Sequence, residues 1–165
     1  MNLIIYSSKT GNTKLVCNEV FLRSKVFNKI ISIDELSNTN LDDYQNILIG
    51  YWNYMGKCDP KTENLLTNIL KNKNLFLLGT LGAYDNSKHC ETMKERVKTF
   101  ALLHNNVIGE FACRGKIDMS IDMIKAHQNY TEEDRIRKES SLLHPNEEDF
   151  KNATNEVLKV FSVWT

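Results

Sequence analysis

The sequence has no excess of charge of either sign and no long apolar run. Lysine and arginine together number 21, and so do aspartate and glutamate, so the formal net charge at pH 7 is zero. Proteins that bind nucleic acid or anionic membranes usually carry a basic surface, and we therefore expect neither partner. No apolar stretch approaches the roughly 20 residues that span a bilayer. Residues 1–15 lack the pattern of a signal peptide, which predicts a cytoplasmic protein.

Cysteines and nucleotide-binding motifs are also scarce. The four cysteines form no Cys-x-x-Cys pair, and no histidine lies at zinc-ligand spacing from them, so we assign no metal site. We expect reduced thiols that pack in the interior rather than redox groups. The glycine-containing turn at residues 8–13 has neither the Gly-x-Gly-x-x-Gly pattern of dinucleotide sites nor the Gly-Lys-Ser/Thr of a Walker loop. The cysteines are Cys17, Cys58, Cys90 and Cys113.

An apolar segment near the start of the chain runs directly into a turn rich in hydroxyls and glycine. Residues 3–5 are continuously apolar, as expected of a strand buried on both faces. The next apolar residues recur at helical spacing over residues 16–21. The turn between them therefore opens a helix, whose first N–H groups are unpaired and carry partial positive charge. This composition predicts an anion site, although a simple N-cap and turn would use the same residues.

Strand-like and helix-like segments alternate along the rest of the chain. This alternation predicts a parallel sheet covered by helices on both faces, in a single domain spanning residues 1–165. The last helix has one apolar stripe, which ends at Trp164. The predicted strands are residues 3–5, 29–33, 47–50, 75–78 and 107–113. The predicted helices lie near residues 13–25, 60–70, 93–104 and 146–164.

The turn after the first predicted strand resembles the phosphate loop of the flavodoxin family, whose pattern is Ser/Thr-x-Thr-Gly-x-Thr. The resemblance implies that the loop binds the terminal phosphate of FMN through hydroxyls and backbone amides, without metal or arginine. It also implies a flavodoxin-like three-layer α/β/α fold with a five-stranded parallel sheet of order 2-1-3-4-5. Ligands bind such sheets where the strand order reverses. The turn reads Ser8-Lys9-Thr10-Gly11-Asn12-Thr13, in which the lysine departs from the family pattern.

Two further loops follow predicted strands at the same edge of the sheet, and the resemblance implies that both contact the flavin ring. In the first loop, Trp52 or Tyr54 can stack on one ring face, or the indole can simply fill a gap beneath the loop. In the second loop, Tyr84 can cover the other face or lie in solvent. The implied residues are Trp52, Asn53, Tyr54, Met55 and Gly56, and then Thr80, Leu81, Gly82, Ala83 and Tyr84.

Residues 115–145 depart from this pattern, because about thirty residues are too many for an ordinary connection. Ile117, Ile121 and Ile124 recur at helical spacing, and residues 131–134 have the composition of a helix start. We therefore expect one or two short surface helices. The sequence leaves three roles open for this segment, which are to cover the flavin, to dock a partner or to mediate self-association.

Together these features predict an FMN-binding flavodoxin that shuttles electrons between redox partner proteins and has no catalytic residue of its own. Two alternatives stay open, an NAD(P)H-dependent flavin or quinone reductase of the same fold and a binding module that has lost the flavin. No nicotinamide site is recognisable, which favours the shuttle. The run Gly79-Thr80-Leu81-Gly82 departs from electron-transfer flavodoxins and resembles the divergent flavodoxins of anaerobic bacteria, including those found beside a bilirubin reductase.

Overall fold

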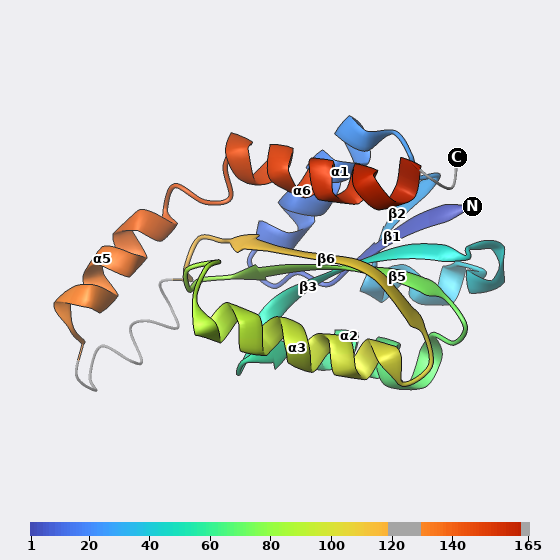
Figure 1. Cartoon of the computed structure of the whole chain (residues 1–165), viewed down its shortest axis with the longest axis horizontal. Coiled ribbons are helices and arrows are strands. Elements are labelled where there is room, and N and C mark those ends of the chain that lie inside the picture. Colours follow the sequence, from blue (N-terminus) through green and yellow to red (C-terminus); the bar gives the residue numbers. More distant parts are fainter. Residues whose placement is uncertain (119–129, 163–165) are drawn as a thin grey trace.

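The computed structural model describes residues 1–118 and 130–162, and within these residues the chain forms one twisted sheet between two layers of helices (Figure 1). The strands are β1 (Asn2–Tyr6), β2 (Lys29–Ser32), β3 (Asn46–Tyr54), β4 (Lys57–Cys58), β5 (Asn74–Leu81) and β6 (Asn106–Arg114). The parallel strands lie in the order β2-β1-β3-β5-β6, and β4 pairs antiparallel with β3. When the five parallel strands alone are numbered along the chain, their order is 2-1-3-4-5. The strand order implied by the resemblance to flavodoxins is therefore confirmed.

Helices cover both faces of the sheet, as the alternating sequence pattern predicts. The helices are α1 (Asn12–Ser24), α2 (Pro60–Asn64), α3 (Lys88–Leu102), α5 (Glu132–Ser141) and α6 (Glu147–Phe161). α1 and α6 lie on one face, and α2 and α3 lie on the other (Figure 1). α2 continues into a π-helical turn, and two short 3-10 helices connect β2 to β3; their bounds are Leu65–Ile69, Ile33–Asn38 and Leu41–Asp43.

The two faces of the sheet bury separate apolar clusters. Successive side chains of a strand point to opposite faces, so the neighbours Leu3 and Ile4 enter different clusters. Leu3 belongs to the cluster that also contains Met93 of α3, and Ile4 belongs to the cluster that also contains Val20 of α1 and Val157 of α6. This two-sided burial explains the continuously apolar strands, because each buried Leu or Ile contributes about 1.5–3 kcal/mol to folding.

β3 is longer than the sequence predicts, and the expected loop over residues 51–56 is mostly strand. Trp52 pairs with Thr80 of β5, so the ladder holds the chain extended beyond the apolar run. The chain then reverses at Met55 and Gly56, whose φ angles are 51° and 77°. Left-handed values at both positions are typical of a tight hairpin turn. The sequence did not reveal β4, because two residues are too few to show a periodicity.

The described part of residues 115–145 contains α5, which projects away from the sheet (Figure 1). Thr131 and Asp134 cap each other's backbone N–H groups at its start, as the composition of residues 131–134 predicts. The expected helical spacing of Ile121 and Ile124 and the end of the final apolar stripe at Trp164 lie outside the described residues. Among the described residues, no helix is long and apolar enough to cross a membrane.

Candidate functional site

A cleft of about 1010 Å³ opens at the carboxyl ends of β1, β3 and β5, where the strand order reverses. Parallel α/β sheets bind ligands at this position. Of the sixteen residues that the sequence predicts for the cofactor, fourteen line the cleft, whereas Gly11 and Tyr84 are not among the described lining residues. The fourteen are Ser8, Lys9, Thr10, Asn12, Thr13, Trp52, Asn53, Tyr54, Met55, Gly56, Thr80, Leu81, Gly82 and Ala83.

The loop after β1 leaves the first N–H groups of α1 without a side-chain cap. Gly11 occupies the N-cap position with a φ of 98° and has no side chain that could accept from them. Ser87, Thr131 and Asn146, by contrast, cap α3, α5 and α6. The first turn of α1 also contains no acidic residue among its described side chains. Unpaired N–H groups and the positive end of the helix dipole together favour an anion here.

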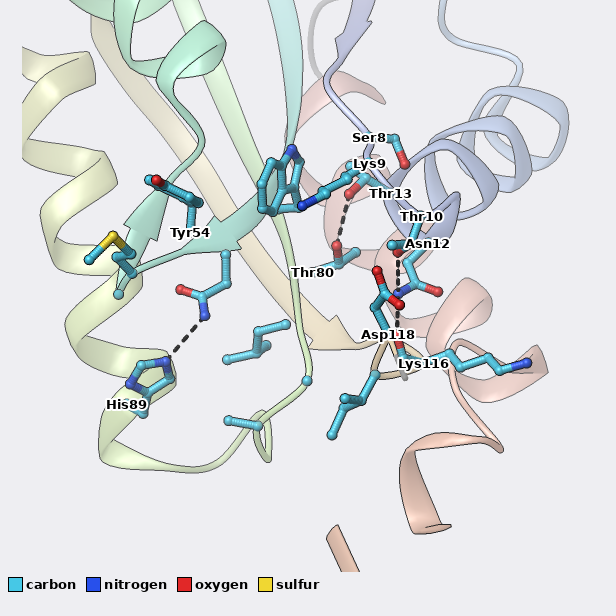
Figure 2. Close-up of a pocket in the computed structure, with 18 of the residues that line it drawn as sticks. Ser8, Lys9, Thr10, Asn12, Thr13, Tyr54, Thr80, His89, Lys116 and Asp118 are labelled. Atoms are coloured by element: carbon cyan, nitrogen blue, oxygen red, sulfur yellow. Dashed lines mark hydrogen bonds between the residues drawn. The ribbon is translucent and has the colours of Figure 1, made fainter. Parts of the chain in front are cut away.

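The hydroxyl groups around this helix start are only partly satisfied. The buried Oγ of Ser8 has no hydrogen-bond partner within residues 1–118 and 130–162. Thr13 Oγ1 and Thr80 Oγ1 lie 2.8 Å apart and bond to each other, which links the loop to the end of β5 (Figure 2). A hydrogen bond between two hydroxyls uses only one of their two protons, so the other proton is available to donate to a ligand. This set of donors fits a phosphate group.

A segment that follows β6 closes one side of the phosphate loop. Asn12 Nδ2 donates to the backbone oxygen of Lys116 at 2.9 Å (Figure 2). Gly115 permits this approach, since a Cβ there would lie 2.5 Å from Asn12 Nδ2. Covering the flavin was one of the three roles that the sequence left open for residues 115–145, but the sequence did not predict which residues of this segment reach the cleft. The segment contributes to the cleft lining Lys116, Ile117 and Asp118.

The end of β3 supplies an aromatic wall. The rings of Trp52 and Tyr54 meet edge to face, with their centroids 5.6 Å apart. Lys9 Nζ lies 5.7 Å from the centroid of the Trp52 ring, so the departure from the loop pattern places a cation against the indole. Asn53 Nδ2 and His89 Nε2 lie 3.3 Å apart, whereas Asn53 Oδ1 has no partner in the described part of the chain (Figure 2). A donor on a ligand can satisfy this oxygen.

The ring of Tyr84 packs against Arg114. The Arg114 guanidinium carbon lies 4.4 Å from the centroid of the ring, a cation–π arrangement. Arg114 is 6% exposed and donates to the backbone oxygen of Arg137 and to Ser140 Oγ, each at 3.0 Å. The stack therefore joins the loop after β5 to α5. A role for Tyr84 as a ring cover stays a prediction, and it requires the phenol to turn toward the cleft.

Cys58 and Cys90 are buried and do not belong to the described lining of the cleft. Burial raises the pKa of the Cys58 thiol to about 12 and raises the pKa of Cys90 above its ordinary value. Both thiols are therefore protonated at neutral pH, and a protonated thiol is a poor nucleophile. This environment supports the packing role expected from the sequence.

α3 contributes lining residues that the sequence analysis did not predict. Lys88, Thr92 and Arg96 recur every four residues and so share one face of the helix, with His89 beside them. Arg96 Nη1 donates to the backbone oxygen of Gly56 at 3.2 Å, which ties the hairpin turn to α3. The spacing was visible in the sequence. Only the folded chain shows that this face borders the cleft.

Comparison with known proteins agrees with this architecture. A family model for the flavodoxin domain matches residues 3–158. The flavodoxin-like domain-containing protein BilS of Clostridioides difficile (strain CD3) is 28% identical over 162 residues, which cover 93% of this chain and 92% of that protein. Oxidised flavodoxin 2 from Bacillus cereus aligns with a TM-score of 0.58 and 15% identity over 99% of each chain.

A second solved structure shares the fold. The flavoprotein of Lactobacillus acidophilus NCFM, solved in complex with FMN, has a TM-score of 0.51 and 18% identity, covering 74% of this chain and 96% of its own. The similarity to both solved structures concerns the fold. Because the family model spans nearly the whole sequence, the chain belongs to the flavodoxin family.

Proposed function

We propose that this protein is an electron carrier that binds FMN in the cleft and exchanges electrons with partner proteins. Membership of the flavodoxin family and the FMN complex of the Lactobacillus flavoprotein support FMN as the cofactor. The observation that carries the proposal is that one cleft combines an uncapped helix start with an aromatic wall. The helix start suits a phosphate, and the aromatic wall suits a flat ring system.

The residues present fit this cofactor at both ends of the cleft. Ser8 Oγ, which lacks a partner in the described structure, would donate to the phosphate together with the first N–H groups of α1 and the Thr10 hydroxyl. Trp52 and Tyr54 would pack against the ring and exclude water from one of its faces. Asn53 Oδ1 would accept a hydrogen bond from an N–H group of the ring.

The chemistry of such a carrier resides in its cofactor. FMN supplies reversible one-electron and two-electron transfer when it is bound. The protein then has to orient the ring and tune its electrostatic environment, tasks that need no acid, base or nucleophile from the chain. The exposed hairpin tip at Tyr54 and Met55 leaves one edge of the cleft accessible, as electron exchange with a large partner requires.

FMN binding is testable by visible absorption spectroscopy and by titration. The purified protein should show flavin absorption bands, or acquire them with added FMN, and should bind FMN more tightly than riboflavin because only FMN carries the phosphate. Thr10→Ala should weaken FMN binding by about 10- to 150-fold, from about 1.5–3 kcal/mol for a hydrogen bond to a charged group. The same change should leave riboflavin binding nearly unaltered.

Thr99→Ala is the matched control, because Thr99 is an exposed threonine of α3 outside the described cleft lining. It should leave the affinity for FMN unchanged. A colourless protein that also fails to bind added FMN would refute the proposal.

The carrier role is tested separately from cofactor binding. The FMN-loaded protein should oxidise NADH and NADPH slowly when alone and should be reduced quickly once a flavodoxin reductase is added. Rapid oxidation of either nucleotide by the protein alone would instead identify a reductase.

A further inference from the structure

The cleft has an excess of positive charge, although the chain as a whole is neutral. Among the described residues that line it, five are lysine or arginine and one, Asp118, is a carboxylate. A cleft lined by one sign of charge focuses the electrostatic potential and attracts molecules of the opposite sign. The five cations are Lys9, Lys88, Arg96, Lys116 and Arg137.

Only one of these five cations forms an ion pair within the described residues. Arg137 pairs with Asp134 at 3.1 Å. The other four cations contact an aromatic ring, a backbone oxygen or solvent, and none forms an ion pair with a carboxylate in residues 1–118 or 130–162. These four are Lys9, Lys88, Arg96 and Lys116.

The cations of α3 lie away from the phosphate loop. Figure 2 shows His89, the neighbour of Lys88, across the cleft from Ser8 and Thr10. The phosphate site is at the Ser8 side, so the α3 charges are not needed for it. Lys88 and Arg96 are separated by about 12 Å along the helix axis at 1.5 Å per residue. This spread is too large for one small anion and fits an extended acidic surface.

An exposed apolar tip lies beside these cations. Met55 is 81% exposed and Tyr54 is 39% exposed, and Arg96 holds their turn through the backbone oxygen of Gly56. Methionine, tyrosine and arginine are enriched in protein–protein interfaces. We call the combined area the tip surface, and it consists of Tyr54, Met55, Lys88, Thr92 and Arg96.

We infer that the tip surface docks the acidic face of a protein that exchanges electrons with the flavin. This inference rests on the proposed function, and it adds the charge of the partner. Complementary charge raises the rate of encounter and selects acidic partners over basic ones. The exposed methionine and tyrosine would supply the apolar contact at the centre of the interface, with the α3 cations beside them.

Two haem proteins of opposite charge test the inference. The FMN-loaded protein is reduced with dithionite and mixed in a stopped-flow instrument with the acidic soluble domain of cytochrome b5 or with basic horse heart cytochrome c. Each event moves one electron from the reduced flavin to a ferric haem. The rate with cytochrome b5 should fall about tenfold or more as salt is added, and the rate with cytochrome c should not fall.

Charge-reversal variants locate the effect. Lys88→Glu with Arg96→Glu should slow electron transfer to cytochrome b5 by about tenfold or more and should speed transfer to cytochrome c. Lys71→Glu with Lys98→Glu changes the net charge equally but lies outside the described cleft lining, and it should change both rates by less than about twofold. Lys88→Glu alone gives a second test, because it spares the Arg96 bond to the hairpin turn.

Binding without electron transfer gives an independent measurement. Calorimetry with the oxidised proteins at low salt should rank the variants in the same order. Equal losses of affinity or of electron-transfer rate with cytochrome b5 in both charge-reversal pairs, or no loss in either pair, would overturn the inference. If charge reversal at Lys88 and Arg96 slowed electron transfer to ferricyanide but not to cytochrome b5, the tip surface would attract small anions rather than an acidic protein. This result would also overturn the inference. Failure of the unmodified protein to bind FMN would instead refute the proposed function.

Discussion

The hydroxyls of Thr13 and Thr80 bond to each other across 2.8 Å, although the two residues are 67 positions apart in the sequence. Both side chains are almost fully buried, so each hydroxyl depends on the other for a partner. The bond ties the start of α1 to the end of β5. It therefore fixes the distance between the phosphate loop and the loop that follows β5.

We expect Thr80→Val to destabilise the FMN-free protein by about 1–3 kcal/mol, because it leaves the buried Thr13 hydroxyl without its partner. The double variant Thr13→Val with Thr80→Val should cost less than the sum of the two single variants, since it removes both hydroxyls together. Urea unfolding followed by circular dichroism measures each free energy. Strictly additive costs would show that the two hydroxyls do not interact.

The hairpin turn predicts opposite effects for changes at two adjacent residues. Gly56 has a φ of 77°, and a Cβ there would lie 2.8 Å from Arg96 Nη1, so Gly56→Ala should lower the stability by more than about 1 kcal/mol. Met55 has a φ of 51°, which asparagine adopts more readily, so Met55→Asn should preserve or raise the stability. The midpoints of thermal unfolding distinguish the two. A stabilising Gly56→Ala would contradict this account of the turn.

The buried thiols should resist alkylation in the folded protein. Because burial raises the pKa of Cys58 to about 12 and raises the pKa values of Cys17, Cys90 and Cys113, the thiolate forms are scarce at pH 8. Labelling with iodoacetamide at this pH should be slow and should become fast for all four thiols in urea. Mass spectrometry identifies the modified residues. Fast labelling of one thiol in the native protein would show that it is exposed or activated.

The ion pair between α1 and α6 should make stability depend on acidity. Hydrogen bonds from Arg23 lower the pKa of the Glu147 carboxyl, and Arg23 Nη1 lies 2.5 Å from Glu147 Oε1. A carboxyl whose pKa is lower in the folded state than in the unfolded state stabilises the protein at pH values above the ordinary glutamate pKa. This stabilisation is lost as the pH falls through the lowered pKa. Glu147→Gln should thus be slightly less stable than the unmodified protein at pH 7, and the difference should vanish in strongly acidic solution. Urea unfolding at several pH values measures it.

The sequence determined the layers of the fold and most of the candidate site. Continuously apolar strands can be stable only when both of their faces are covered, and this requirement led from residues 3–5, 47–50 and 75–78 to a parallel sheet between helices. Parallel strands end at the same edge of a sheet, so the three loops that follow them had to converge. The local chemistry of the turn Ser8-Lys9-Thr10-Gly11-Asn12-Thr13 then indicated an anion site.

Only the tertiary structure decided which side chains face the cleft. Tyr84 packs on Arg114, while Lys88 and Arg96 border the cleft, and no local pattern distinguishes these outcomes. The hairpin at Met55 likewise depends on pairing with β4, a strand of two residues. Periodicity and turn chemistry act between neighbours in the sequence, whereas the orientation of a side chain at a site depends on packing with residues far along the chain. The excess of positive charge in the cleft of a neutral chain arises in this way.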